Sequence, residues 1–312
     1  MCRDALDSPA IASVAYALLD ALVVQSSRAQ SPAMLDLLLQ PARLSAIVAT
    51  LNDADLAATL RPDARTLLVW QACGKKKKVD SRWGPLTLAG ANARGPALRR
   101  GAAASLDRLT VHEARLSLLL RLAQTPAGAR ALVAAGLFGM LSKCHYIDLR
   151  PDDYAAAAAV VNDAIPSAST RYHHMIMPVL RLIDAVVAEL HTSDRQVLVQ
   201  AAEFFAARRD WALAMLRDRL PTVTVPTLEQ LKVLTGILAQ VATADRGSGP
   251  ATAATVQWRP ALLGLLGKYG APRQWLPRLR PTTPAEEARQ QVAANVAAGG
   301  KLDARARVAE PT

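Results

Sequence analysis

Apolar residues recur at helical spacing along most of the chain. Three stretches show the pattern most clearly: Leu116, Leu119, Leu120 and Ala123; Met175, Val179, Leu182, Val186 and Leu190; and Leu231, Leu234, Leu238 and Val241. An apolar side chain at every third or fourth position forms a stripe along one side of a helix. Residues 221–227 (PTVTVPT) alternate like a strand, but the prolines that bracket them argue against a central strand. The pattern predicts an all-α chain.

Helix-start signals precede many of these stretches. Residues 110–113, 193–196, 227–230 and 283–286 fit the capping box, in which a Ser or Thr side chain accepts a hydrogen bond from the third amide. A Ser or Thr followed by proline stands at residues 8–9, 31–32, 125–126 and 283–284, and proline's missing N–H costs nothing at a helix start. Helices joined by short turns leave two arrangements, a globular bundle or a stacked solenoid. No fixed period supports a regular repeat.

The most apolar stretch, residues 8–27 (SPAIASVAYALLDALVVQSS), has Asp20 as its one charged residue. Acidic residues precede it, where a signal peptide would have basic ones. The apolar positions with helical spacing are Ile11, Val14, Leu18 and Leu22. We therefore predict a buried amphipathic helix and no transmembrane segment.

The composition favours helices, because aromatic residues, which are enriched in strands, make up only 4% of the chain. The formal charge of +11 is concentrated: residues 74–101 hold eight basic residues against Asp80, a net +7. This segment includes the run Lys75, Lys76, Lys77 and Lys78. In a loop, such a run is either a nuclear-import-like or anion-contacting signal or simply a solvated charge cluster. Three widely spaced cysteines form no disulfide framework or paired metal-ligand motif.

Residues 141–151 (LSKCHYIDLRP) crowd several reactive side chain types together. A helix that starts after Gly136 and ends before Pro151 would place Cys144 on its buried stripe, with His145 and Tyr146 off that line. The residues predicted to share this face are Leu137, Met140, Leu141, Cys144 and Ile147 or Asp148. A buried cysteine behaves as a small hydrophobe, whereas a nucleophilic Cys–His pair would need a base from elsewhere in the fold.

Other candidate chemistry is weak. His173 and His174 are neighbours, so they point about 100° apart on a helix and cannot share a zinc ion on one face. Pro178 should kink the helix that contains it. The chain has no P-loop, GxGxxG, GxSxG or HExxH motif. The sequence predicts no catalytic, cofactor-binding or metal residue, and hence no enzyme.

Residues 111–151 (VHEARLSLLLRLAQTPAGARALVAAGLFGMLSKCHYIDLRP) carry a specific resemblance. They resemble the carboxy-terminal part of the large inner-ring scaffold nucleoporins of the nuclear pore complex. The matching features are the Glu113-Ala114 helix start, Leu119 to Ala123, Thr125, Gly128-Ala129, Leu132, Gly136, Leu141, Cys144 and Asp148 to Pro151. Weaker similarity continues through residues 171–190 and 196–217, and residues 10–72 fit loosely as the preceding helices.

The resemblance implies an irregular α-solenoid of stacked helical hairpins, HEAT/armadillo-like, without enzymatic activity. It also implies linker and inner-ring nucleoporins as partners, a place in the nuclear pore complex at the nuclear envelope, and a scaffold role in nucleocytoplasmic transport. The alternatives are a generic helical-repeat adaptor or transport factor, and a protein that contacts nucleic acid through residues 74–101. Nucleic acid is not the expected partner.

Two segments interrupt the helical pattern and divide the chain. Residues 73–109 are rich in glycine, proline and basic residues, which predicts a flexible insertion, and residues 244–256 resemble a linker. We therefore expect amino-terminal helices (1–72), the basic insertion (73–109), a central helical solenoid (110–243), the linker (244–256), and carboxy-terminal helices with a frayed tail (257–312). A short stretch of solenoid exposes an apolar end, so self-association through the amino-terminal helices is expected.

Overall fold

The computed structural model describes residues 9–28, 33–52, 56, 107–150, 168–217, 223–244, 250–270, 275, 278–281, 287–288 and 291–292. The chain forms two compact units, residues 1–197 and 198–312. All regular structure in the described ranges is helical, apart from one isolated bridge between Val223 and Leu279. The predicted all-α fold is confirmed.

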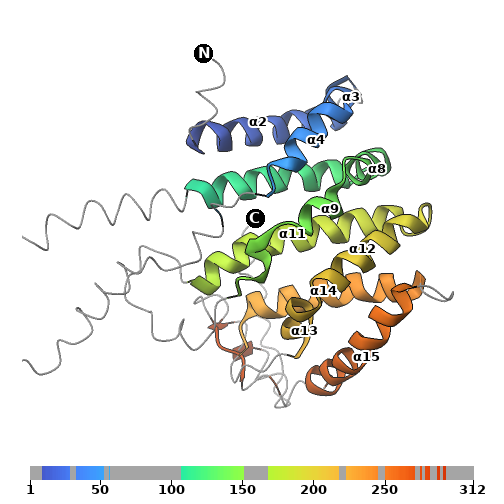
Figure 1. Cartoon of the computed structure of the whole chain (residues 1–312). Helices are drawn as coiled ribbons and strands as arrows, with labels where there is room; N and C mark the ends of the chain where they lie inside the picture. Colours follow the sequence, from blue (N-terminus) through green and yellow to red (C-terminus); the bar gives the residue numbers. More distant parts are fainter. Residues whose placement is uncertain are drawn as a thin grey trace, which may run out of the picture. The chain divides into compact units, whose positions relative to one another are not determined.

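The first unit consists of successive helices that pack against their neighbours in sequence and space (Figure 1). They are α2 (Pro9–Arg28), α3 (Ala33–Leu38), α4 (Pro41–Ala49), a helix over residues 107–123, α8 (Pro126–Ala134), α9 (Leu137–Leu141), the 3₁₀ helix η1 (His145–Asp148) and α11 (Ala168–Leu190). α2 packs on α3, and α8 packs on α4, α9 and α11. These pairings are helical hairpins stacked one on the next, so the fold is the predicted irregular α-solenoid.

The core of the first unit lies along the 107–123 helix. Its buried residues face more than one direction around the helix: Leu116, Leu118, Leu119, Leu122 and Ala123 are fully buried. The predicted stripe on α11 (Met175, Val179, Leu182, Val186 and Leu190) is buried throughout. A helix that is buried on several sides is the interior element of a layered stack, with partners on both sides.

The second unit contains most of α12 (Arg195–Ala207), with α13 (Arg209–Arg217), α14 (Val225–Ala244) and α15 (Pro250–Tyr269). Its core is aromatic: the Phe205 ring lies 6.4 Å from Trp211 and 6.0 Å from Trp258 between ring centroids. α15 packs on α13 and α14. The predicted stripe on α14 (Leu231, Leu234, Leu238 and Val241) is also buried.

The strand-like segment 221–227 makes the isolated bridge and then turns into a helix. The Val223 amide donates to the Arg278 carbonyl at 2.9 Å, and the Arg280 amide donates to the Val223 carbonyl at 2.7 Å. α14 begins two residues later, at Val225. Alternation over a few residues therefore formed one bridge and no strand.

One predicted helix-capping residue caps its helix in the structure, and in other cases the capping residue is a different one. Thr125 accepts a hydrogen bond from the Gly128 amide at 3.1 Å and Pro126 opens α8, as predicted. Asp194, rather than Ser193, caps α12 by accepting from the Gln196 amide at 2.9 Å. Thr224, rather than Thr227, caps α14. Residue 110 lies inside the 107–123 helix rather than at its start. The segment 283–286 lies outside the described residues.

Three other predictions need correction. The helix expected to run from Gly136 to Pro151 stops at Leu141, and η1 follows it. α15 begins at Pro250, inside the stretch predicted to be a linker. The predicted buried stripe of α2 is exposed, because the side of α2 that packs on the unit is a different one. The other segment boundaries remain predictions. α11 contains Pro178 and continues through it as one helix.

Candidate interaction surfaces

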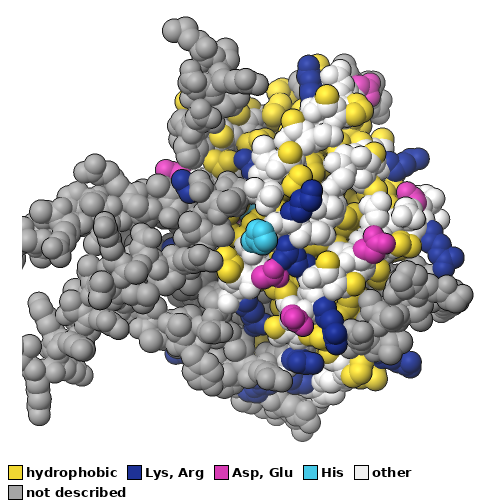
Figure 2. Space-filling view, viewed as in Figure 1, with side chains coloured by type: hydrophobic (Ala, Val, Ile, Leu, Met, Phe, Trp, Pro, Cys, Tyr) yellow, Lys and Arg dark blue, Asp and Glu magenta, His cyan; other side chains and the backbone are white. Residues whose placement is uncertain are grey.

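The basic run Lys75, Lys76, Lys77 and Lys78 lies outside the described residues, as does the rest of the predicted insertion up to residue 106. On the described helices, basic, acidic and apolar side chains are interspersed over the face shown in Figure 2. A nucleic-acid interface requires basic residues clustered on one face or along one helix. The face in view therefore offers no support for phosphate binding by the helices themselves.

Cys144 lies in the core of the first unit, at the break between α9 and η1. Its thiol is fully buried and donates to the carbonyls of Met140 at 3.3 Å and Leu51 at 3.4 Å. The neighbouring His145 is exposed, so no imidazole from the adjacent position enters the core with the thiol. Reactive cysteines are partly exposed in electropositive surroundings. Cys144 therefore acts as a buried packing residue, and its thiol connects the start of η1 to the end of α4.

Tyr146 and Ile147 are buried in η1, although the continuous-helix prediction placed Tyr146 off the buried line. The reason is the backbone of Cys144, which leaves the helical region (φ −75°, ψ 99°) and re-aims the following residues. The Tyr172 hydroxyl of α11 then donates to the Ile147 carbonyl at 2.7 Å. The segment LSKCHYIDLRP thus ends one hairpin and fastens it to the next.

A buried imidazole stands next to Tyr146. His112, on the 107–123 helix, is 1% exposed, and its ring meets the Tyr146 ring edge-to-face at 5.3 Å between centroids. Its Nε2 lies 3.3 Å from the Met175 carbonyl of α11, so the neutral ring with a proton on Nε2 donates there. Burial lowers the pKa of His112 to about 4; the charge of Arg115 lowers it further, and the bond to Met175 opposes both. The ring is neutral at physiological pH.

Arg115, one turn along the same helix, joins it to α2 and to the end of α4. Its guanidinium donates to the Thr50 carbonyl at 2.5 Å and lies 5.3 Å from the centroid of the Tyr16 ring. A guanidinium over an aromatic face gains cation–π attraction, and more so where water is excluded. Arg115 therefore fixes how the amino-terminal helices sit on the 107–123 helix.

His173 and His174 do not form a shared site. The His174 ring is exposed and pairs with the Glu113 carboxylate at 2.7 Å, whereas His173 is half-buried. Burial lowers the pKa of His173 to about 4, with smaller contributions from the charges of His174 and Arg181. Nowhere in the described ranges do three or more His, Cys, Asp or Glu residues form a group able to hold a metal ion.

The amino-terminal helix exposes the apolar residues predicted to be buried. On α2, Ile11 is 50% exposed, Val14 58%, Leu18 60% and Leu22 41%, and we call these four residues the α2 apolar face. In the view of Figure 2, apolar side chains reach the surface over α2. Scattered exposed apolar residues are ordinary, but a contiguous apolar row marks an interaction site. In the second unit, Leu263 and Leu266 on α15 are similarly exposed.

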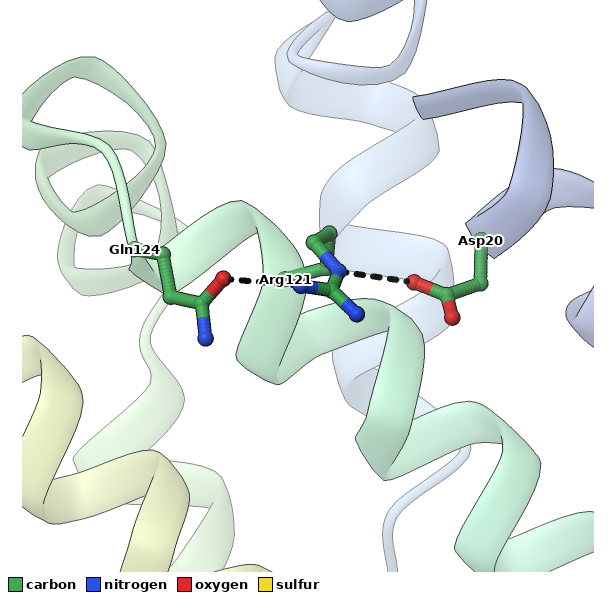
Figure 3. Close-up of polar contacts among 3 residues, drawn as sticks. All are labelled: Asp20, Arg121 and Gln124. Carbon is green, nitrogen blue, oxygen red and sulfur yellow. Dashed lines mark hydrogen bonds and ion pairs between the residues drawn. The ribbon is translucent and has the colours of Figure 1, made fainter. Parts of the chain in front are cut away.

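The opposite side of α2 is docked. Val23 is buried, Tyr16 lies against Arg115, and Asp20 accepts from Arg121 at 3.4 Å. Figure 3 shows Arg121 between Asp20 and Gln124, whose side chain oxygen accepts from the same guanidinium at 3.2 Å. Because successive helix residues are 100° apart, the docked residues fall on the side facing away from the α2 apolar face. The orientation of α2 is thus fixed by specific contacts.

Sequence reasoning missed the polar core formed by His112, Arg115 and Tyr146. The sequence does place His112 and Arg115 three residues apart, hence on one side of a helix. It does not indicate that their partners are Met175 and Thr50, more than sixty residues away. The sequence signal for this polar core was the presence of a histidine and an arginine within an otherwise apolar helix.

No helix within the described ranges has the length and hydropathy needed to cross a membrane.

Stacked hairpins around an interior helix define an irregular α-solenoid, a class of protein that offers extended surfaces to other proteins. Residues 96–242 match the family model described as "Nuclear pore complex scaffold, nucleoporins 186/192/205". This part of the chain is similar to that scaffold nucleoporin family. The resemblance read from residues 111–151 is therefore confirmed, and the match extends from before the 107–123 helix almost to the end of α14.

Two curated relatives are each similar to part of the chain. The chain is 31% identical to the nuclear pore complex protein Nup205 of Drosophila melanogaster over 141 residues, which is 44% of this chain and 7% of the relative. It is 27% identical to the Homo sapiens protein of the same name over 140 residues, again 44% and 7%. The chain therefore covers only a small part of the length of these relatives, and α2, α3 and α4 lie before the family match.

Proposed function

We propose that this chain is a structural scaffold segment of the inner ring of the nuclear pore complex, located at the nuclear envelope, that binds linker nucleoporins and supports nucleocytoplasmic transport. The observation that carries the proposal is the family match over residues 96–242, which coincides with the stacked hairpins of the solenoid. A scaffold role requires a rigid protein surface that partners can bind, and it does not require catalytic chemistry.

The contacts within the first unit support a rigid scaffold. The 107–123 helix is held to α11 through His112 and to the end of α4 through Arg115. η1 is held to α11 through Tyr172 and to the end of α4 through Cys144. Buried hydrogen bonds of this kind specify one geometry, because a misplaced hairpin would leave polar groups unpaired in the core. A fixed stack presents the same surface to every partner segment.

The test is affinity purification of the tagged chain from its own cells at physiological salt with nuclease present, followed by mass spectrometry. Recovery of inner-ring and linker nucleoporins is the expected result. Recovery of nucleic-acid-associated proteins, or of unrelated transport cargo without nucleoporins, would overturn the proposal.

A matched variant separates the scaffold from the adaptor alternative. Replacing the four residues Lys75, Lys76, Lys77 and Lys78 with alanine removes the import-like run without touching the described helices. A scaffold segment is expected to keep its position at the nuclear rim and its nucleoporin partners in this variant. Loss of both, with diffuse distribution of the chain, would favour a transport factor that depends on the basic run.

A further inference from the structure

The carboxyl end of α4 is completed by groups from another part of the chain. The last carbonyls of a helix have no partner within the helix and carry a partial negative charge. The last turn of α4 contains no basic residue of its own. The Arg115 guanidinium donates to the carbonyl of Thr50, the residue that caps α4, and the Cys144 thiol donates to the carbonyl of Leu51 at 3.4 Å. A cation and a second donor therefore stand where the helix end carries its negative charge.

The two donors are buried, so they need an acceptor. Arg115 is only 8% exposed, and Cys144 is fully buried. A buried guanidinium without an acceptor costs more than an unpaired neutral group, because its charge has been taken out of water. The end of a helix supplies two carbonyls in succession together with the negative end of the helix dipole. The chemistry of the two donors therefore fits the carboxyl end of a helix.

The helix end and its two donors lie far apart in the sequence. Thr50 is 65 residues from Arg115, and Leu51 is 93 residues from Cys144. The family match over residues 96–242 includes both donors but not α4. These hydrogen bonds join the two parts of the chain directly, and neither involves a residue between them in the sequence.

We propose that Arg115 and Cys144 form a binding site for the carboxyl end of a helix, and that the segment α2–α4 occupies this helix-end site as a non-covalent ligand. Apolar burial supplies affinity, because α4 packs on α8 and α9 with Leu44 and Val48 buried. The two hydrogen bonds supply selectivity, because they require a helix that ends at the donors. The class of partner that fits the site is a helical segment with uncapped carbonyls and no basic residue in its last turn, whether or not it is joined to residues 107–150.

Cleavage of the folded chain tests the proposal. A specific protease site is placed between Gly90 and Ala91, within the predicted insertion, and the full chain is cut after it has folded. We expect residues 1–90 and 91–312 to stay together at micromolar concentration and to separate on dilution. Sedimentation velocity over a dilution series gives the dissociation constant, and circular dichroism before cleavage verifies that each variant folds.

Two pairs of variants separate the helix-end site from general burial. Arg115→Met removes the charge and the donor and is expected to raise the dissociation constant about tenfold or more. Its matched control is Arg130→Met, at an exposed arginine whose Nε donates to the Pro126 carbonyl of the same helix, and no change is expected there. Tyr16→Ala removes the ring beside Arg115 and should also weaken binding, whereas Leu18→Ala, on the exposed side of α2, should not.

Two results would overturn the proposal. Fragments that separate at every concentration would show that α2–α4 needs its covalent connection to stay bound. Equal dissociation constants for Arg115→Met and Arg130→Met would show that apolar burial alone holds the segment. If Arg115→Met does not fold, Tyr16→Ala decides the question, because it leaves residues 91–312 unchanged, and a dissociation constant equal to that of Leu18→Ala refutes the proposal. Neither result depends on the proposed scaffold role, because binding is measured on the pure chain.

Discussion

His112 should make the first unit sensitive to acid in a pH range where most surface groups do not change charge. The ring is 1% exposed and its pKa is lowered from 6.5 to about 4, chiefly by burial. The unfolded chain therefore binds a proton between pH 6.5 and 4 that the folded chain does not bind. Stability rises with pH wherever the unfolded state holds more protons. The contribution of His112 is complete above pH 6.5 and is lost as the pH falls towards 4.

The magnitude follows from the two pKa values. A shift of one pKa unit corresponds to 1.36 kcal/mol, so complete loss would be about 3 kcal/mol. Between pH 7 and pH 5 the linkage relation gives about 2 kcal/mol. This is a large share of the 5–15 kcal/mol that typical domains have in total.

The perturbation is His112→Gln, whose amide can donate to the Met175 carbonyl in place of Nε2 but does not titrate. Urea unfolding followed by circular dichroism at pH 7 and pH 5 gives the free energies, and hydrogen exchange of the 107–123 helix assigns the change to the first unit. The variant is expected to lose about 2 kcal/mol less stability over this range than the unsubstituted chain. His173, whose pKa burial also lowers, contributes equally to both chains.

The control is His191→Gln, at an exposed position. This variant keeps His112 and should therefore retain the acid-dependent loss of stability that His112 contributes. If instead His112→Gln shows the full acid-dependent loss, burial does not hold the His112 imidazole neutral in the core.

Three further substitutions test the packing of the matched region. Gly128→Ala should cost about 1–3 kcal/mol or more, because a Cβ would clash with the Leu122 carbonyl oxygen and the backbone cannot easily yield; a thermal melt measures the loss. Tyr172→Phe removes the donor to the Ile147 carbonyl and should cost about 1 kcal/mol, with faster amide exchange in η1 and no change elsewhere. Cys144→Ser keeps a donor in place and should cost about 1 kcal/mol or less while leaving the recovered partners unchanged; loss of partners would indicate a role for the thiol itself.

The sequence was sufficient to predict the helices whose apolar stripes are covered. On α11 and α14 the period of apolar residues gave both the helix and its buried side, because a stripe with a partner helix on it is the arrangement that the pattern assumes. On α2 the same reasoning found the helix and the apolar side but not its exposure. Periodicity reports which side of a helix is apolar, and it carries no information about whether another element covers that side.

The break after α9 shows a second limit. Cys144 was predicted to be buried and is buried, but it was predicted within one continuous helix through residue 150, whereas α9 ends at Leu141. The amides of Lys143 and Cys144 bond to carbonyls three residues back, which tightens the turn and ends the helix. No glycine or proline stands at this break to signal it. The burial of Tyr146 follows from that local geometry and could not be read from helical spacing.

The polar contacts around the 107–123 helix explain how the register of neighbouring helices is set, which the apolar stripes do not explain. Apolar burial is non-directional, so leucine-rich faces specify the register of two helices less strictly than buried hydrogen bonds do. The bonds from His112 to Met175 and from Arg115 to Thr50 each require one register, since a shift of 5.4 Å would leave a buried donor without an acceptor. The hairpins before and after the 107–123 helix are therefore set by polar contacts, and burial supplies most of the stability. A scaffold whose surface must have a fixed shape requires both.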